Sequence, residues 1–260
     1  MKYIEEFKLL PGPLYPTGPD DLQYSKLLPD FLSVDECNDF RHNLAVQPAD
    51  WHYRTQDVKY VMNQNYYRAP EWDTVDWQNS IVVFGCSHVF GEGLAENETL
   101  SHHLSKLTDR PVINLGQSGT GTMFSWHNSL LLDKWWPTPY AVIQVWSDMA
   151  RIPYYEKDKV SRIGYWSGGK WDNFDSRLKQ LFEIWNGNET NSQAYMYFTA
   201  LASEQFWKSK TRYVQASFFK ETATLLNIPQ LYKIDSARDF IHYGTDTHRA
   251  AATVIESALR

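Results

Sequence analysis

The stretch SIVVFGCSH, residues 80–88, decides the fold of this chain. Its apolar residues follow one another without alternation and end at Gly85, which is typical of a parallel strand buried on both faces. In an open parallel sheet, ligands bind where the strands end at their carboxyl edge. The serine and the histidine that follow Gly85 are therefore the first candidates for chemistry.

Similar apolar runs alternate with helical patterns along the rest of the chain. The runs that predict further strands are VINLG (112–116), YAVIQV (140–145) and QLYKI (230–234). The stretches with helical periodicity are 98–107, 123–134, 212–226 and 245–259, the last with Thr245 as its N-cap. This alternation is the signature of βαβ units. It predicts an α/β fold, a flavodoxin-like three-layer α/β/α sandwich around a parallel sheet.

Two segments depart from the alternation. Residues 1–78 are predicted to form an N-terminal extension that packs on the main domain of residues 79–260, with a helix from Ser33 to about Leu44. Residues 152–210 read as an aromatic-rich, lid-like insertion with one helix near residues 174–185. We expect both segments to lie outside the alternating units.

Composition excludes several classes of protein. The 260 residues include 25 Lys and Arg against 31 Asp and Glu, a formal net charge of −6, and no basic stripe that would predict a nucleic-acid partner. Two cysteines, Cys37 and Cys86, predict neither a disulfide framework nor a metal site. No apolar run approaches the roughly 18 residues of a membrane span, and the N-terminus lacks a signal-peptide pattern. We expect a cytoplasmic protein, or a virion-associated one if a phage encodes it.

The chain is rich in aromatic residues, with 11 Trp and 16 Tyr. One interpretation is a large aromatic core. The other is an aromatic-lined groove that binds sugars or similar ligands. The sequence leaves both open.

Residues suited to acyl transfer follow the predicted strands. Ser87 follows the first strand, a Gly-rich loop at 116–119 follows the second, and an Asp239/His242 pair lies before the last helix. A serine hydroxyl needs a histidine to accept its proton, and that histidine needs an acceptor that fixes its tautomer. Backbone N–H groups of a Gly-rich loop can hold the oxyanion.

These residues resemble the four conserved blocks of the SGNH hydrolases, also called GDSL esterases and lipases. The blocks are Gly85-Cys86-Ser87, Gly119, Ser147-Asp148 and Asp239-x-x-His242. The runs FGCSHVFGEG, VINLGQSGTG and ARDFIHYG are similar to a branch often met in bacteriophage and bacterial genomes. The resemblance covers about residues 79–260.

The resemblance implies a role for each site residue. Ser87 would be the nucleophile, His242 the general base and then acid, and Asp239 its orienting partner, with no cofactor and no metal. The oxyanion donors would be the backbone N–H groups of Ser87 and Gly119, together with Ser147, which stands where the family has an Asn. Further residues expected to line the site are His88, Gln117, Trp146, Asp148 and Arg151. The family's Asp before the nucleophile is Cys86 here, and Val145 replaces a glycine.

Other interpretations of these residues stay open. Ser87 is also a suitable helix N-cap, and Cys86 could be the nucleophile with His88 or His242. Asp246 and His248 form a rival acid–histidine pair. His102 and His103 are more typical of a solvated helix face than of a metal site.

The resulting expectation is a serine esterase that removes acyl groups, acetyl first, from a small molecule or a glycan. One alternative is a weak or inactive SGNH-fold binding or virion module, because Ser147 is a shorter donor than Asn. The other alternative is a sugar O-acyltransferase, which would require a closed site that excludes water. The oligomeric state does not follow from the sequence.

Overall fold

Four parallel strands form the central sheet of the computed structural model. They are β1 (Ile81–Gly85), β2 (Val112–Gly116), β3 (Ala141–Trp146) and β6 (Arg212–Ser217), in the order β2-β1-β3-β6. The structure describes residues 14, 45–54, 58, 60–156, 159–164, 176–239 and 241–260, with the backbone alone for 154–156 and 159–163. The strand order reverses direction between β1 and β3. In doubly wound sheets the ligand site lies beside this switch point, at the carboxyl ends of the strands.

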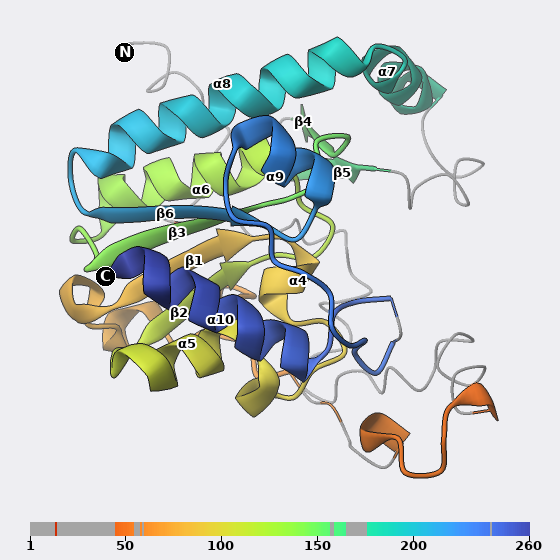
Figure 1. The fold of residues 1–260 in the computed structure, drawn as a ribbon. Helices are drawn as coiled ribbons and strands as arrows, with labels where there is room; N and C mark the ends of the chain where they lie inside the picture. The colour runs from red at the N-terminus through yellow and green to blue at the C-terminus, as the bar shows by residue number, and fades with distance from the viewer. Residues whose placement is uncertain are drawn as a thin grey trace.

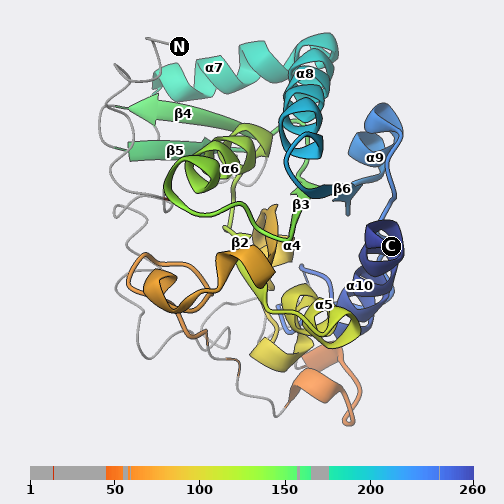
Figure 2. The same ribbon diagram turned by 90° about the vertical axis from the view of Figure 1, so that its left-hand side faces the viewer.

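Helices cover both faces of the sheet (Figure 1 and Figure 2). On one face lie α6 (Thr122–Trp135) and α8 (Glu189–Lys208), and on the other lie α5 (Leu100–Thr108) and α10 (Thr245–Leu259). The short helix α4 (Ser87–Phe90) follows β1 at the carboxyl edge of the sheet. The predicted flavodoxin-like three-layer α/β/α fold with a parallel sheet is confirmed.

Two apolar cores result from the alternation of side chains along the strands. Val82 and Phe84 point toward α6 and α8, and Val83 points toward α5 and α10. Every residue of β1 and β3 is buried, as expected for strands covered on both faces. The uninterrupted apolar runs seen in the sequence have this cause.

The last strand lies elsewhere than predicted. The stretch 212–226, expected to be one helix, divides into β6 and the helix α9 (Lys220–Leu226). The expected strand 230–234 makes only an isolated bridge, from Gln230 to Ser217. Gly244, and not Thr245, is the N-cap of α10.

The region expected to be an insertion contains a hairpin of β4 (Ile152–Glu156) and β5 (Lys159–Ile163), then α7 (Ser176–Asn186) and α8. The helix near 174–185 is confirmed as α7. The much longer helix α8 was not predicted. Its Trp207 is fully buried against α6, so α8 belongs to the outer layer of the sandwich and is not part of a lid.

The described part of residues 45–79 consists largely of loops and the short 3-10 helices His52–Arg54, Trp72–Thr74 and Trp77–Asn79. Tyr67, Trp72 and Trp77 join the core beneath α6. The helix predicted from Ser33 to Leu44 lies outside the described residues. This segment also contacts the loop after α4, which bears on the site below.

Four of the nine described tryptophans lie in the core. Trp72, Trp77, Trp146 and Trp207 are each at most 5% exposed, whereas Trp135 is 54% exposed. These four buried residues fit the interpretation as an aromatic core better than the interpretation as a sugar-binding groove. Within the described ranges, no helix is both long and apolar enough to cross a membrane.

Candidate active site

Ser87 lies at the carboxyl end of β1, where α4 begins. Gly85 and Gly116 end their strands as register partners, and α4 packs directly on both. A Cβ at Gly85 would lie 2.3 Å from the Val89 side chain, and one at Gly116 would lie 2.4 Å from the backbone N of Phe90. Only glycine permits this close approach. The two glycines therefore let α4 place Ser87 at the edge of the sheet.

The hydroxyl of Ser87 does not cap the helix. Cys86 occupies the N-cap position of α4 and makes no side-chain cap hydrogen bond. Ser87 is the first helical residue, is 4% exposed, and has no side-chain hydrogen bond to any described residue. The interpretation of Ser87 as an N-cap is wrong. Cys86, 2% exposed, stays a neighbouring thiol to be tested.

Asp239 and His242 are joined as the sequence predicted. Nδ1 of His242 hydrogen-bonds Oδ2 of Asp239, and Oδ1 of Asp239 accepts from the backbone N–H of His242 at 2.9 Å and of Ile241 at 3.1 Å. These contacts fix both the carboxylate and the imidazole. A carboxylate at Nδ1 leaves Nε2 as the nitrogen available for proton transfer.

A second carboxylate occupies that nitrogen. Oε2 of Glu92 lies 3.0 Å from Nε2 of His242, and no hydrogen bond joins Ser87 to His242 in the described part of the chain. Burial alone would lower the pKa of His242. Glu92 and Asp239 more than reverse this effect and raise that pKa to about 10. At neutral pH the ring is therefore an imidazolium held between two carboxylates.

Glu92 was not among the residues predicted from the sequence. It lies in the turn Gly91-Glu92-Gly93, and both glycines have left-handed backbone conformations, with φ of 81° and 76°. A tight turn of this kind close to the candidate nucleophile was the one available signal. The contact between Glu92 and His242, which lies 150 positions later in the chain, could be found only from the tertiary structure.

His88, the residue after Ser87, contacts the ring of His242. Its ring centroid lies 5.1 Å from that of His242 and 4.4 Å from that of Tyr243. Burial, followed by the nearby charge of His242, lowers the pKa of His88 well below its usual value, so this ring is neutral. Its Nδ1 is buried without a hydrogen-bond partner among the described residues. The neutral ring of His88, the residue that follows Ser87 in the sequence, therefore packs against His242.

Two backbone N–H groups at the predicted oxyanion positions are unoccupied. Neither Ser87 nor Gly119 donates a backbone hydrogen bond to a described residue. Gly119 has φ of 69°, a conformation that favours glycine. The loop that carries it is tied to β1, because Gln117 N donates to the Gly85 carbonyl at 3.0 Å. The hydroxyl of Ser147 instead makes a long 3.4 Å contact with the carbonyl of Asp148.

The amide of Gln117 donates to the Tyr66 carbonyl at 2.9 Å. The carboxylate of Asp148 accepts from the backbone N–H of Ala150 at 2.7 Å, which shapes the turn after β3. Trp146 is 1% exposed and donates its indole N–H to Gln215 at 2.6 Å, so it lies in the core. These contacts give the three side chains structural roles.

Arg151 is the one cation among the predicted lining residues. It donates to the Thr120 carbonyl at 3.3 Å, and its guanidinium lies 5.3 Å from the centre of the Phe219 ring. The Phe219 ring in turn contacts His88, with centroids 5.5 Å apart. Arg151 therefore borders the candidate site through Phe219.

The rival acid–histidine pair is not assembled. The carboxylate of Asp246 pairs with Arg249 at 2.6 Å near the surface, whereas His248 is 1% exposed and its Nδ1 accepts from Leu100 N at 2.8 Å. Burial lowers the pKa of His248 to about 3. Asp246 does not orient the ring of His248, so these two residues lack the geometry of a catalytic acid–histidine pair.

Glu92, Asp239 and His242 each place one potential ligand atom within 4.8 Å of the others, the one such group among the described residues. Direct hydrogen bonds between the imidazole and the two carboxylates account for this proximity.

Solved structures of several ester hydrolases are similar to this chain. An acetyl xylan esterase from Butyrivibrio proteoclasticus has a TM-score of 0.43 and 10% identity over 72% of this chain and 65% of that one. A carbohydrate esterase family 2 enzyme from Myceliophthora fergusii has 0.42 and 12% over 70% and 65%. A member of the lipolytic G-D-S-L family from Veillonella parvula has 0.39 and 10% over 67% and 94%. No protein-family model matches the chain, and no curated protein matches it.

Proposed function

We propose that this protein is a serine ester hydrolase of the SGNH type, with Ser87 as nucleophile and His242 and Asp239 as its base and orienting acid. The observation that carries the proposal is the fixed Asp239–His242 pair beside His88, whose neighbour is Ser87. Ser87 follows β1 at the carboxyl edge of the sheet, next to the strand-order reversal, and the ring of the adjacent His88 contacts His242.

Acylation begins once Nε2 of His242 carries a lone pair. This nitrogen takes the proton of the Ser87 hydroxyl as Oγ bonds to the acyl carbon, and the carbonyl electrons move onto its oxygen. The backbone N–H groups of Ser87 and Gly119 have no other described acceptor, so they are suited to bind that oxyanion. The carbonyl then re-forms, the ester C–O bond breaks, and His242 gives its proton to the departing alkoxide.

Hydrolysis of the acyl-serine repeats these steps with water. His242 removes a proton from the water as its oxygen attacks the acyl carbon, and the Ser87 alkoxide leaves with the proton that His242 carried. The products are a carboxylic acid, an alcohol and the original serine. Ser87 is only 4% exposed, which favours short acyl groups such as acetyl. A glycan is one alcohol component to test.

A second candidate is a binding module with weak or no catalysis. The contact between Glu92 and Nε2 of His242 favours it, because that nitrogen faces a carboxylate instead of the serine. Hydrolysis assays separate the two candidates.

The experiment measures hydrolysis of p-nitrophenyl acetate and butyrate, release of acetate from acetylated xylan, and labelling by a fluorophosphonate probe. The wild type and the Ser87→Ala and Cys86→Ala variants are compared. We expect Ser87→Ala to abolish both turnover and labelling, and Cys86→Ala to retain both. Loss of labelling in Cys86→Ala alone would make the thiol the nucleophile. A folded wild type that neither labels nor hydrolyses any of the esters would favour the binding module.

A further inference from the structure

Glu92 lies opposite Asp239 across the ring of His242. Asp239 accepts at Nδ1 and Glu92 at Nε2, with the Glu92 contact at 3.0 Å. The three side chains are largely enclosed, at 12%, 16% and 14% exposure for Asp239, Glu92 and His242. When both ring nitrogens donate hydrogen bonds, the imidazole has no lone pair with which to accept the proton of a serine.

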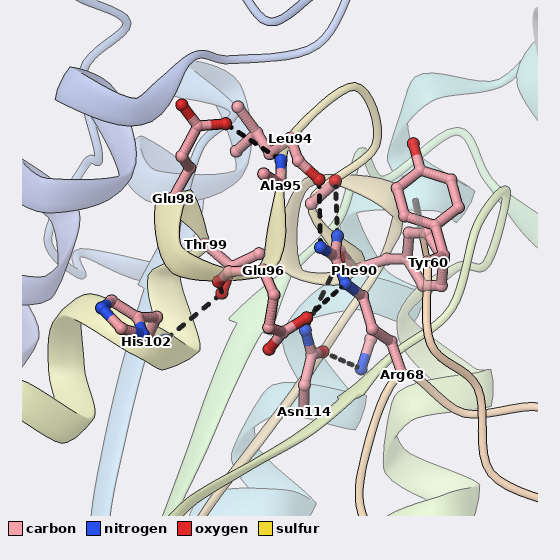
Figure 3. A network of polar contacts seen from close by, with 12 residues as sticks. Tyr60, Arg68, Phe90, Leu94, Ala95, Glu96, Glu98, Thr99, His102 and Asn114 are labelled. Atoms are coloured by element: carbon pink, nitrogen blue, oxygen red, sulfur yellow. Dashed lines mark hydrogen bonds and ion pairs between the residues drawn. The ribbon is translucent and has the colours of Figure 1, made fainter. Parts of the chain in front are cut away.

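The backbone on either side of Glu92 is fixed from two directions. Gly93 N donates to the Tyr60 hydroxyl at 2.7 Å, and the Gly93 carbonyl accepts from Arg238 N at 3.2 Å. On the other side, the buried guanidinium of Arg68 donates to the carbonyls of Gly91 and Leu94 (Figure 3). A Cβ on Gly93 would lie 2.9 Å from Ala237, so the turn packs closely against the segment that carries Asp239. Because the backbone on both sides is held, departure of the Glu92 carboxylate from His242 would require side-chain rotation and not movement of the loop.

We propose that Glu92 is a positioning residue that holds His242 as an imidazolium in the free protein, and that its carboxylate must leave Nε2 before Ser87 is activated. The inference rests on the proposed function for its catalytic consequence. The charge state of His242 can be measured without any activity.

The other polar groups around His242 do not keep its ring protonated. The neighbouring rings are His88 from α4, His248 from α10 and Tyr243. Burial lowers the pKa of His88 and His248 and raises that of Tyr243, so all three stay neutral near pH 7. Arg151 is nearby and further lowers the pKa of His88. The two carboxylates are thus the groups that hold the proton on His242.

The predicted effect is large at neutral pH. With a pKa of about 10, about one His242 ring in a thousand is neutral at pH 7. Replacing Glu92 by the isosteric Gln removes one of two neighbouring negative charges, and one opposite charge typically changes a pKa by about one to three pH units. The neutral fraction at pH 7 should then rise by about tenfold to a thousandfold.

The first test is the ¹⁵N NMR titration of His242 in the wild type and in Glu92→Gln, with the signal assigned by its loss in His242→Asn. We expect protonation to persist above about pH 8.5 in the wild type and to end at least one pH unit lower in Glu92→Gln. The matched control is Glu189→Gln, which removes an exposed carboxylate at the start of α8 and should leave the titration unchanged. An ordinary pKa in the wild type, or an equal one in Glu92→Gln, overturns the inference.

The second test is the pH dependence of kcat/KM for p-nitrophenyl acetate. In Glu92→Gln the acid limb should move to lower pH by the same amount as the NMR titration, and kcat/KM at pH 7 should rise at least tenfold. A purely structural role for Glu92 would lower activity at every pH without moving the limb, and that result contradicts the inference. If the wild type and Ser87→Ala are equally inactive, the proposed function fails, and the NMR titration still decides the role of Glu92.

Discussion

Arg68 provides the sharpest stability prediction. Its side chain is 1% exposed, and its guanidinium donates to the carbonyls of Phe90, Gly91 and Leu94 at 2.9 to 3.2 Å and to Glu96 at 2.7 Å (Figure 3). Arg68→Met keeps most of the side-chain length but removes every donor. The three carbonyls then lose a buried donor, and a buried unsatisfied group costs about 1 to 3 kcal/mol.

We expect Arg68→Met to lower the free energy of unfolding by roughly 3 to 5 kcal/mol, because three hydrogen bonds from a charged donor to buried carbonyls are lost and each contributes about 1.5 to 3 kcal/mol, partly offset by the cost of burying the guanidinium. Urea denaturation followed by tryptophan fluorescence measures this change. With a denaturant slope of about 3 kcal/mol/M, the midpoint should fall by about 1 M or more.

The matched control is Arg249→Met on α10. Arg249 pairs with Asp246 at 2.6 Å, but their side chains are 60% and 53% exposed, so the loss should stay below about 1 kcal/mol. Equal losses in Arg68→Met and Arg249→Met would refute the claim that the buried guanidinium holds the loop after α4.

Three further predictions concern single side chains. Asp239→Asn should lower kcat by about 10⁴-fold, as expected when a histidine loses its orienting carboxylate, with ester hydrolysis as the assay; a loss below tenfold would remove Asp239 from the mechanism. Ser147→Ala should lower kcat by less than about tenfold, because its hydroxyl makes a 3.4 Å contact with Asp148, whereas a true oxyanion donor is worth about 10²- to 10³-fold. Because burial lowers the pKa of His248 to about 3, the unfolded chain binds the proton more tightly. The free energy of unfolding should then fall as the pH falls from about 6.5 toward 3, by up to about 1.4 kcal/mol per pH unit. Urea midpoints from pH 7 to 4 should show a smaller decline in His248→Asn, and equal declines would contradict this account.

The central strands could be predicted because burial on both faces requires an uninterrupted run of apolar residues. The runs around Val83 and Ile143 contain almost no polar residue. The edge strand β6 lacks such an apolar run. Its Arg212, Tyr213 and Gln215 are exposed or half-buried, and neither Gly nor Pro separates it from α9, so the two elements read as one helix.

Helix α8 was missed for a different reason. The residues it buries include Ser192, Thr199, Ala200 and Ser203, which are small or polar and produce no apolar stripe. Exposed Tyr197 and Phe198 obscure the periodicity further. Close packing against α6 and the sheet, and not hydrophobic contrast, determines which side of this helix is buried.

The candidate site was predictable where its parts are local. Asp239 and His242 are three residues apart, and a single turn brings them together. The position of Glu92 depends on contacts with Tyr60, Arg68 and Arg238, which come from distant parts of the chain. A short sequence motif does not encode contacts between distant parts of the chain. Glu92, the residue with the largest effect on the charge of His242, could therefore not be predicted.

The hydrogen bond from Leu100 N to His248 Nδ1 joins residues 148 positions apart and ties α10 to α5. Closing so long a loop is slow, because its entropy is lost before the contact forms. The turn that carries Glu92 and the segment that carries His242 lie just before these two anchoring points. We therefore expect the docking of α10 to be a late step of folding. Refolding followed in parallel by fluorescence and by ester hydrolysis should show tryptophan burial before activity returns.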